Sequence, residues 1–227
     1  MRFRNRQEAG RTLAARLLEY KGQHLLVLAL PRGGVPVASE VAAALDAPLD
    51  VIVVRKLGAP GQPELGIGAV VDGDQPQSVL NEEVVRELEV SNEYLRRETQ
   101  LELEEIRRRQ ERYRRGRPRL PVDGRTVIVV DDGIATGASM RAALRGVRRG
   151  RPKRLVLAVP VAPPDTIESL RAEVDDVVCL STPAFFQAVG QFYDDFRQTS
   201  DEEVVELLDA AQRRCAVHEQ SAGRGAT

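Results

Sequence analysis

The stretch that decides the fold is Val129-Val130-Asp131-Asp132-Gly133-Ile134-Ala135-Thr136-Gly137-Ala138-Ser139. A continuous apolar run from Thr126 to Val130 leads into it, as in a strand that is buried on both faces. A helical pattern from Met140 to Val147 follows it. We therefore predict a strand that delivers two carboxylates to the edge of a sheet, then a tight turn, then a helix. In such a turn the backbone N–H groups and the hydroxyls of Thr136 and Ser139 face the positive end of the helix, which favours a phosphate.

The two adjacent acids refine this prediction. Asp131 and Asp132 would repel a phosphate placed directly on them, but they suit a sugar diol or a hydrated Mg²⁺ ion. The loop has neither the GxxxxGK[ST] nor the GxGxxG pattern of other nucleotide sites. It predicts a ligand with a phosphate at one end and a sugar diol beside it. The alternative is an ordinary strand–turn–helix whose acids cap the helix.

Other apolar runs alternate with helical patterns along the chain. The predicted strands are residues 24–30, 49–54, 126–130, 155–161 and 177–180. Such alternation predicts an α/β fold, a Rossmann-like parallel sheet flanked by helices. Ligands of these sheets bind beyond the carboxyl ends of the strands. Two further strand ends carry unusual residues, Pro31-Arg32-Gly33-Gly34 and Arg55-Lys56.

The stretch from Val127 to Ser139 resembles the 5-phosphoribosyl-1-pyrophosphate (PRPP) signature of the type I phosphoribosyltransferases, and the order of elements over roughly residues 20–200 is similar. The resemblance implies that a nitrogenous base or amine displaces pyrophosphate from PRPP to give a ribonucleoside 5-phosphate, with Mg²⁺ as cofactor. It places the carboxylates on the ribose hydroxyls and near Mg²⁺, and the loop around the 5-phosphate. The residues implied for ribose and 5-phosphate are Asp131, Asp132, Gly133, Ile134, Ala135, Thr136, Gly137, Ala138 and Ser139.

The resemblance also gives the other two strand ends a role. It implies a pyrophosphate loop at Arg32, Gly33 and Gly34, which family members often build with a strained or cis peptide bond. It also implies that one or both of Arg55 and Lys56 contact the pyrophosphate or the 5-phosphate side. Arginine suits phosphate oxygens. The expected catalytic residues are Asp131, Asp132, Arg32 and Lys56. The alternatives are a turn made only for folding at residues 31–34 and a solvent-facing pair at 55–56.

Two segments stand apart from the predicted core. Residues 58–119 begin rich in Gly and Pro and continue rich in charge, which predicts a flexible loop with short antiparallel strands followed by solvated helices. We expect this insertion to act as a mobile cover. Residues 181–215 predict a small hood and a C-terminal helix that opens at the capping box of Ser200. In the hood, Phe185 or Phe186 would stack on a flat acceptor, or else pack in the hood core. We expect one domain over residues 1–220 and a frayed tail at 221–227.

Composition excludes several classes of protein. The formal net charge is −1 and only 4% of residues are aromatic, which argues against a nucleic-acid platform. Two cysteines do not form a disulfide framework, and no apolar run approaches the length of a membrane span. We expect a cytoplasmic protein that binds neither nucleic acid nor membrane, and by analogy with the family a homodimer.

The acceptor stays open. Hypoxanthine-guanine members of the family place an acid where this chain has Ala135, whereas adenine-specific members share its Ala-Thr-Gly sequence. A second reading is a PRPP-sensing regulatory protein without transferase activity, although such relatives usually carry a DNA-binding domain. A third is a PRPP-using fold that has become a hydrolase or scaffold.

Overall fold

The core of the protein is a five-stranded parallel sheet. The computed structural model describes residues 1–72 and 77–224. The strands are ordered β2-β1-β6-β7-β8 and all neighbours are parallel. They are β1 (Leu25–Ala29), β2 (Leu49–Val51), β6 (Thr126–Val130), β7 (Arg154–Val161) and β8 (Asp176–Ser181). Every residue of β1 and β6 is buried, because helices cover both faces. The structure confirms the predicted α/β fold.

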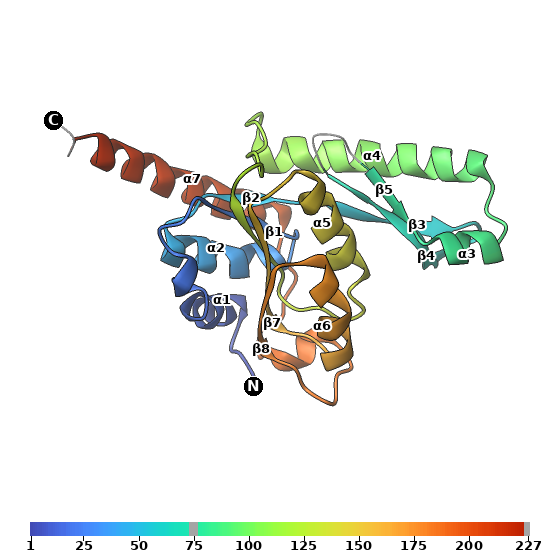
Figure 1. The fold of residues 1–227 in the computed structure, drawn as a ribbon, viewed down its shortest axis with the longest axis horizontal. Coiled ribbons are helices and arrows are strands. Elements are labelled where there is room, and N and C mark those ends of the chain that lie inside the picture. The colour runs from blue at the N-terminus through green and yellow to red at the C-terminus, as the bar shows by residue number, and fades with distance from the viewer. Residues whose placement is uncertain (73–76, 225–227) are drawn as a thin grey trace.

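Helices pack on the two faces in two groups (Figure 1). One face carries α1 (Arg6–Ala15), α2 (Gly34–Leu45) and the first half of α7 (Asp201–Arg224). The other carries α5 (Ala138–Arg149) and α6 (Pro164–Leu170). Each group has its own apolar cluster against the sheet. Short 3₁₀ turns at Leu18–Tyr20, Arg171–Glu173 and Val189–Phe192 complete the connections.

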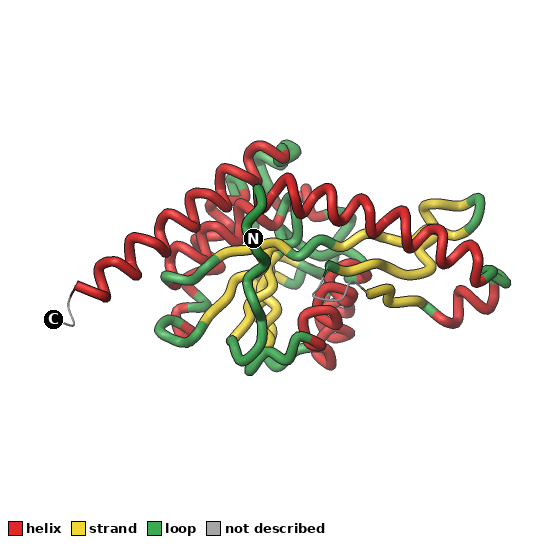
Figure 2. Tube along the Cα trace, turned by 90° about the horizontal axis from the view of Figure 1, so that it is seen from above, coloured by secondary structure: helices red, strands yellow, loops and turns green. Residues whose placement is uncertain are grey.

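The insertion forms a second, smaller sheet with a long helix beside it. Its antiparallel strands are β3 (Val54–Ala59), β4 (Gln62–Val71) and β5 (Gln77–Leu80), followed by α3 (Glu82–Glu87) and α4 (Asn92–Arg114). Figure 2 shows these strands on the opposite side of the core from the C-terminus. The antiparallel strands and the charged helices agree with the sequence-based prediction. Asn81 caps α3, as expected from its position before two glutamates, because its side chain accepts from the Val84 N–H.

A buried arginine at the end of α4 connects the insertion to the core. Arg114 donates from Nε to Asp50 Oδ1 at 2.9 Å and from Nη2 to Asp72 Oδ2 at 3.1 Å. It also donates to the Val51 carbonyl at 2.9 Å. Asp50 lies at the core edge in β2 and Asp72 follows β4, so this single side chain joins the two sheets.

The prediction of one strand over residues 49–54 was wrong. β2 ends at Val51 and β3 begins at Val54, so Arg55 and Lys56 lie in the insertion sheet, opposite Val70 and Ala69, and not at the carboxyl edge of the core. The intervening Ile52 and Val53 are both buried. The apolar run is therefore unbroken where the chain passes from one sheet to the other, and periodicity alone does not reveal the change.

The C-terminal helix is longer than the predicted end near Cys215. It continues to Arg224, because residues 201–222 contain neither Gly nor Pro to stop it. The frayed tail predicted for 221–227 is thus helical as far as 224, and residues 225–227 lie outside the described residues. Within the described part of the chain, no helix is both long enough and apolar enough to span a bilayer.

Candidate functional site

Two loops meet at the carboxyl edge of the core sheet. One follows β1 and leads through Pro31-Arg32-Gly33-Gly34 into α2; the other follows β6 and leads through Asp131 to Gly137 into α5. Their strands are neighbours in the sheet, and the Leu30 N–H donates to the Val130 carbonyl at 3.0 Å just before both loops begin. The site residues predicted on these two strand ends are therefore brought together.

The contact between the loops requires glycine. A Cβ atom on Gly33 would lie 2.1 Å from Asp132 Oδ2, and one on Gly34 would lie 2.9 Å from the Asp131 Cα. Any side chain at either position would displace the carboxylates. The Pro31–Arg32 peptide bond in the same loop is cis, as the resemblance led us to expect.

The two carboxylates occupy different surroundings. Asp132 is buried, whereas Asp131 is half-buried and its Oδ1 accepts from the Asp132 backbone N–H at 2.8 Å. Burial, and then the neighbouring Asp132, raises the pKa of Asp131 well above its usual range. Burial also raises the pKa of Asp132, with the charge of Arg6 opposing it. The pair thus presents two acceptors in a confined space, which suits the adjacent hydroxyls of a sugar.

Two residues from distant parts of the chain hold Asp132, and the sequence signalled neither. Arg6 in α1 donates from Nε to Asp132 Oδ2 at 2.7 Å. The Tyr193 hydroxyl donates to the Asp132 backbone carbonyl at 2.6 Å. Burial, and then the charge of Asp132, raises the pKa of Tyr193, so its hydroxyl keeps its proton and remains a donor. No spacing or motif in the sequence links residue 6 or 193 to residue 132.

The loop that opens α5 has the geometry expected of a phosphate site. Gly137 precedes the helix with a φ of +80°, a left-handed conformation that glycine adopts at little cost. Thr136, Ala138 and Ser139 are exposed beside it. The Ala135 carbonyl accepts from the Thr166 hydroxyl at 2.8 Å, which fixes the loop against α6.

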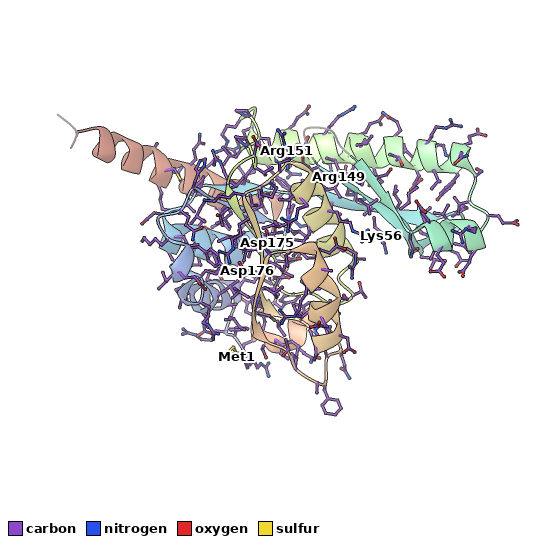
Figure 3. The ribbon with its side chains drawn as sticks, viewed as in Figure 1. Met1, Lys56, Arg149, Arg151, Asp175 and Asp176 are labelled. Carbon is purple, nitrogen blue, oxygen red and sulfur yellow. The ribbon has the colours of Figure 1, made fainter. Side chains whose placement is uncertain are left out.

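An open cavity of about 400 Å³ lies over this loop, between α5 and the insertion sheet. Thr136, Ala138 and Ser139 form one wall, and Lys56 with residues of β4 and β5 forms the other. Figure 3 shows Lys56 beside α5 on the side of the insertion. Although Lys56 is not at the core edge, the second sheet brings its cation to the predicted phosphate loop.

The two predicted cations Arg32 and Arg55 have acidic partners. Arg32 Nη1 lies 3.6 Å from Asp201 Oδ1, at the start of α7. Burial acts to raise the pKa of Asp201, but the Tyr113 hydroxyl and Arg112 hold this pKa below its usual range. The Asp201 carboxylate is therefore charged. Arg55 donates to Glu102 of α4 at 2.6 Å. Arg32 thus links its own loop to the start of α7, whereas Arg55 serves the contact between β3 and α4.

The two hood phenylalanines differ in exposure. Phe186 stacks on Phe192 with ring centroids 5.4 Å apart, in a small apolar cluster with Phe3 and Tyr193. Phe185 is 91% exposed. Phe186 therefore packs in the hood core, which was the alternative prediction for the two phenylalanines. Phe185 is the one of the two whose ring is open to a ligand.

The acidic pair is not a metal cage by itself. In residues 1–72 and 77–224, no group of three or more His, Cys, Asp or Glu side chains is arranged to hold a metal ion. One of the two carboxylates also has Arg6 as its partner. This donor set fits a hard cation that is held mainly by ligand oxygens and water, with one carboxylate beside it.

Comparisons with known proteins agree with this geometry. A sequence model of the phosphoribosyl transferase domain matches residues 3–197. Two curated proteins from two strains of Mycobacterium tuberculosis have names that describe them as provisional phosphoribosyl transferases. Each is 52% identical to this chain over 211 residues, which is 93% of this chain and 47% of the relative. The chain thus spans about half the length of the curated relatives it matches. The crystal structure of TT1426 from Thermus thermophilus superposes with a TM-score of 0.78 at 48% identity, over 92% of this chain and 98% of that one. Together with the two loops at the sheet edge, these matches show that the chain belongs to the phosphoribosyl transferase family.

Proposed function

We propose that the protein is a PRPP-dependent transferase that joins the ribose 5-phosphate unit to a nitrogenous base or amine and releases pyrophosphate. The observation that carries the proposal is the convergence of three sites along one edge. An acidic pair lies at the end of β6, a glycine turn packs directly on it, and the loop that opens α5 faces Lys56 across a cavity. With the glycine turn on one side of the acidic pair and the α5 loop following the pair, the three sites match the sequence of pyrophosphate, ribose and 5-phosphate in PRPP.

Each site has a chemical task in this proposal. Asp131 and Asp132 accept hydrogen bonds from the ribose hydroxyls, and the N–H groups of residues 135–139 bind the 5-phosphate. Gly33 and Gly34 allow the backbone to approach the pyrophosphate, with Arg32 as the neighbouring cation. Lys56 adds its charge on the phosphate side. Arg55, the other cation expected on this side, pairs with Glu102 of α4.

The reaction requires positioning and charge neutralisation more than covalent chemistry. Its transition state resembles an oxocarbenium ion at C1 of the ribose, as in glycoside chemistry. The protein orients two substrates, binds the leaving group and excludes water. Mg²⁺ bound through PRPP oxygens and water, with Asp131 beside it, would supply charge neutralisation of the pyrophosphate. The insertion, which forms one wall of the cavity, is the part of the chain placed to cover the ligand.

The acceptor belongs on the side of the hood. Ala135 offers no acid to a purine ring, and Phe185 offers an exposed aromatic face. The acceptor that fits Ala135 and Phe185 is a flat base or an aromatic amine that does not require an acidic side chain of the protein to bind it.

The test is release of pyrophosphate from PRPP with Mg²⁺ and a panel of bases and amines, alongside calorimetric titration of PRPP. We expect PRPP to bind and at least one acceptor to trigger release. The Asp131→Asn/Asp132→Asn double variant should lose PRPP binding and stay folded, whereas Asp123→Asn, an exposed acid in a distant turn, should behave as wild type. PRPP binding without release for any acceptor would favour a sensor, and absence of PRPP binding would refute the proposal.

A further inference from the structure

Arg6 is held in place by three groups from two parts of the chain. Its Nε donates to Asp132 Oδ2 at 2.7 Å, and its Nη1 donates to the Arg197 carbonyl at 2.8 Å. Its guanidinium carbon lies 4.0 Å from the centre of the Phe196 ring, a cation–π contact. The residue is only 8% exposed. An arginine fixed by a carboxylate, a carbonyl and a ring has one available orientation, and that orientation is directed at the acidic pair.

The backbone around Arg6 is fixed as well. The Phe3 N–H donates to the Phe192 carbonyl, and the Asp194 N–H donates back to the Phe3 carbonyl, each at 2.8 Å. Asn5 then caps α1 by accepting from the Glu8 N–H at 2.9 Å. The N-terminal segment is thus paired with the hood before the helix begins, and this pairing sets the position from which Arg6 reaches Asp132.

The groups that face Asp132 leave Arg6 as its source of positive charge. Asp131 adjoins it in the same loop, Gly33 packs against its carboxylate from the neighbouring loop, and Tyr193 from the hood donates to its backbone carbonyl. In the part of the chain that the structure describes, Arg6 alone forms an ion pair with this carboxylate. Without Arg6, the hydrogen bond that fixes Asp132 Oδ2 would be lost.

We propose that Arg6 is a positioning residue of the PRPP site: its hydrogen bond to Oδ2 fixes the orientation of the Asp132 carboxylate, so that this carboxylate accepts a ribose hydroxyl. This inference rests on the proposed function and deepens it. It assigns a role to a residue more than 120 positions before the signature loop. It also makes PRPP binding depend on the docking of the N-terminal segment on the hood.

The experiment measures the dissociation constant of PRPP with Mg²⁺ at pH 7 for the wild type, Arg6→Met, Arg6→Lys and the control Arg4→Met. Arg4 belongs to the same segment but is exposed, and its guanidinium pairs with Glu8. We expect Arg6→Met to bind about 10- to 100-fold more weakly, as for the loss of a residue that orients a binding side chain. Arg6→Lys should recover part of this loss because it restores a donor, and Arg4→Met should match the wild type.

Several outcomes would overturn the inference. Arg6→Met affinity within twofold of the wild type would do so, and so would an equally large loss of affinity in Arg4→Met, since that is the sign of a general disturbance of the N-terminal segment. A wild type that fails to bind PRPP would refute the proposed function itself, which keeps the two failures distinct.

A second variant pair covers the case in which Arg6→Met does not fold. In an Asp132→Asn background the carboxylate that Arg6 pairs with is absent, so Arg6→Met/Asp132→Asn should fold. It should bind PRPP no more weakly than Asp132→Asn alone. Additional weakening in the double variant would show that Arg6 acts independently of Asp132 and would overturn the proposal.

Discussion

Replacing Arg114 by methionine should strongly lower the stability of the protein. The side chain is 7% exposed, and its partners Asp50 and Asp72 are 4% and 1% exposed. Removal of one partner from a buried ion pair typically costs 3–5 kcal/mol, because the remaining charge stays buried without compensation; about that cost is expected here. For a chain of this size, each kcal/mol corresponds to a shift of roughly 2–4 °C in Tm. The melting temperature should therefore fall by roughly 6–20 °C.

The assay is urea and thermal unfolding followed by circular dichroism, with Arg115→Met as the matched control. Arg115 is the next residue, and its ion pair with Asp209 is at the surface, so its loss should cost less than about 1 kcal/mol. The variant Arg114→Met/Asp50→Asn/Asp72→Asn, which removes the stranded charges as well, should recover much of the loss. If Arg114→Met cost less than about 1 kcal/mol, the claim that this cluster joins the two sheets would be refuted.

Three further predictions concern the charges around the site and the insertion helix. Asp201→Asn removes the negative partner of Arg32 and should tighten pyrophosphate binding by about 2- to 10-fold in calorimetry at low salt; unchanged binding would mean that Arg32 does not face the leaving group. Lys56→Gln should weaken PRPP binding by roughly tenfold, since a charge-assisted contact to phosphate is lost, whereas Lys21→Gln, on an exposed surface, should change nothing. The pKa of Glu105 is lowered to about 2 by hydrogen bonds from two arginines of α4, so its contribution is present above pH 4.5 and lost as the pH falls toward 2. The difference in unfolding free energy between the wild type and Glu105→Gln should accordingly be below about 1 kcal/mol at pH 7 and vanish as the solution is acidified; a difference that grows in acid would contradict this sign.

The core and its signature loop were predictable because the information there is local. The strand from Thr126 to Val130 was predictable from its continuous run of strand-forming residues, and the structure has β6 at these residues. The two acids and the glycine turn that follow it also predict the start of the next helix. The same holds for the antiparallel strands and charged helices of the insertion. Their alternating apolar and polar residues and their helix caps involve residues that are close together in the sequence.

The contacts that complete the candidate site join residues that are far apart in the sequence, and no motif or spacing predicts them. Arg6 and Tyr193 reach Asp132 from both ends of the chain, and Asp201 reaches Arg32 from the last helix. Such pairings depend on how finished elements pack. The misplacement of Lys56 has a related cause, since a buried crossing at Ile52 and Val53 resembles a continuing strand until the partner strands are known.

The two ends of the insertion meet at one point. The chain leaves the core after Val51, returns through Arg114, and is already back at β2 when the Leu120 N–H donates to Asp50 Oδ2 at 3.1 Å. A segment with adjoining ends can be lengthened, shortened or exchanged as a unit without changing the path of the chain through the core. The wall of the cavity that holds Lys56 is thus modular, so transplanting residues 54–113 between relatives is a direct way to vary what covers the ligand while the acidic loop stays the same.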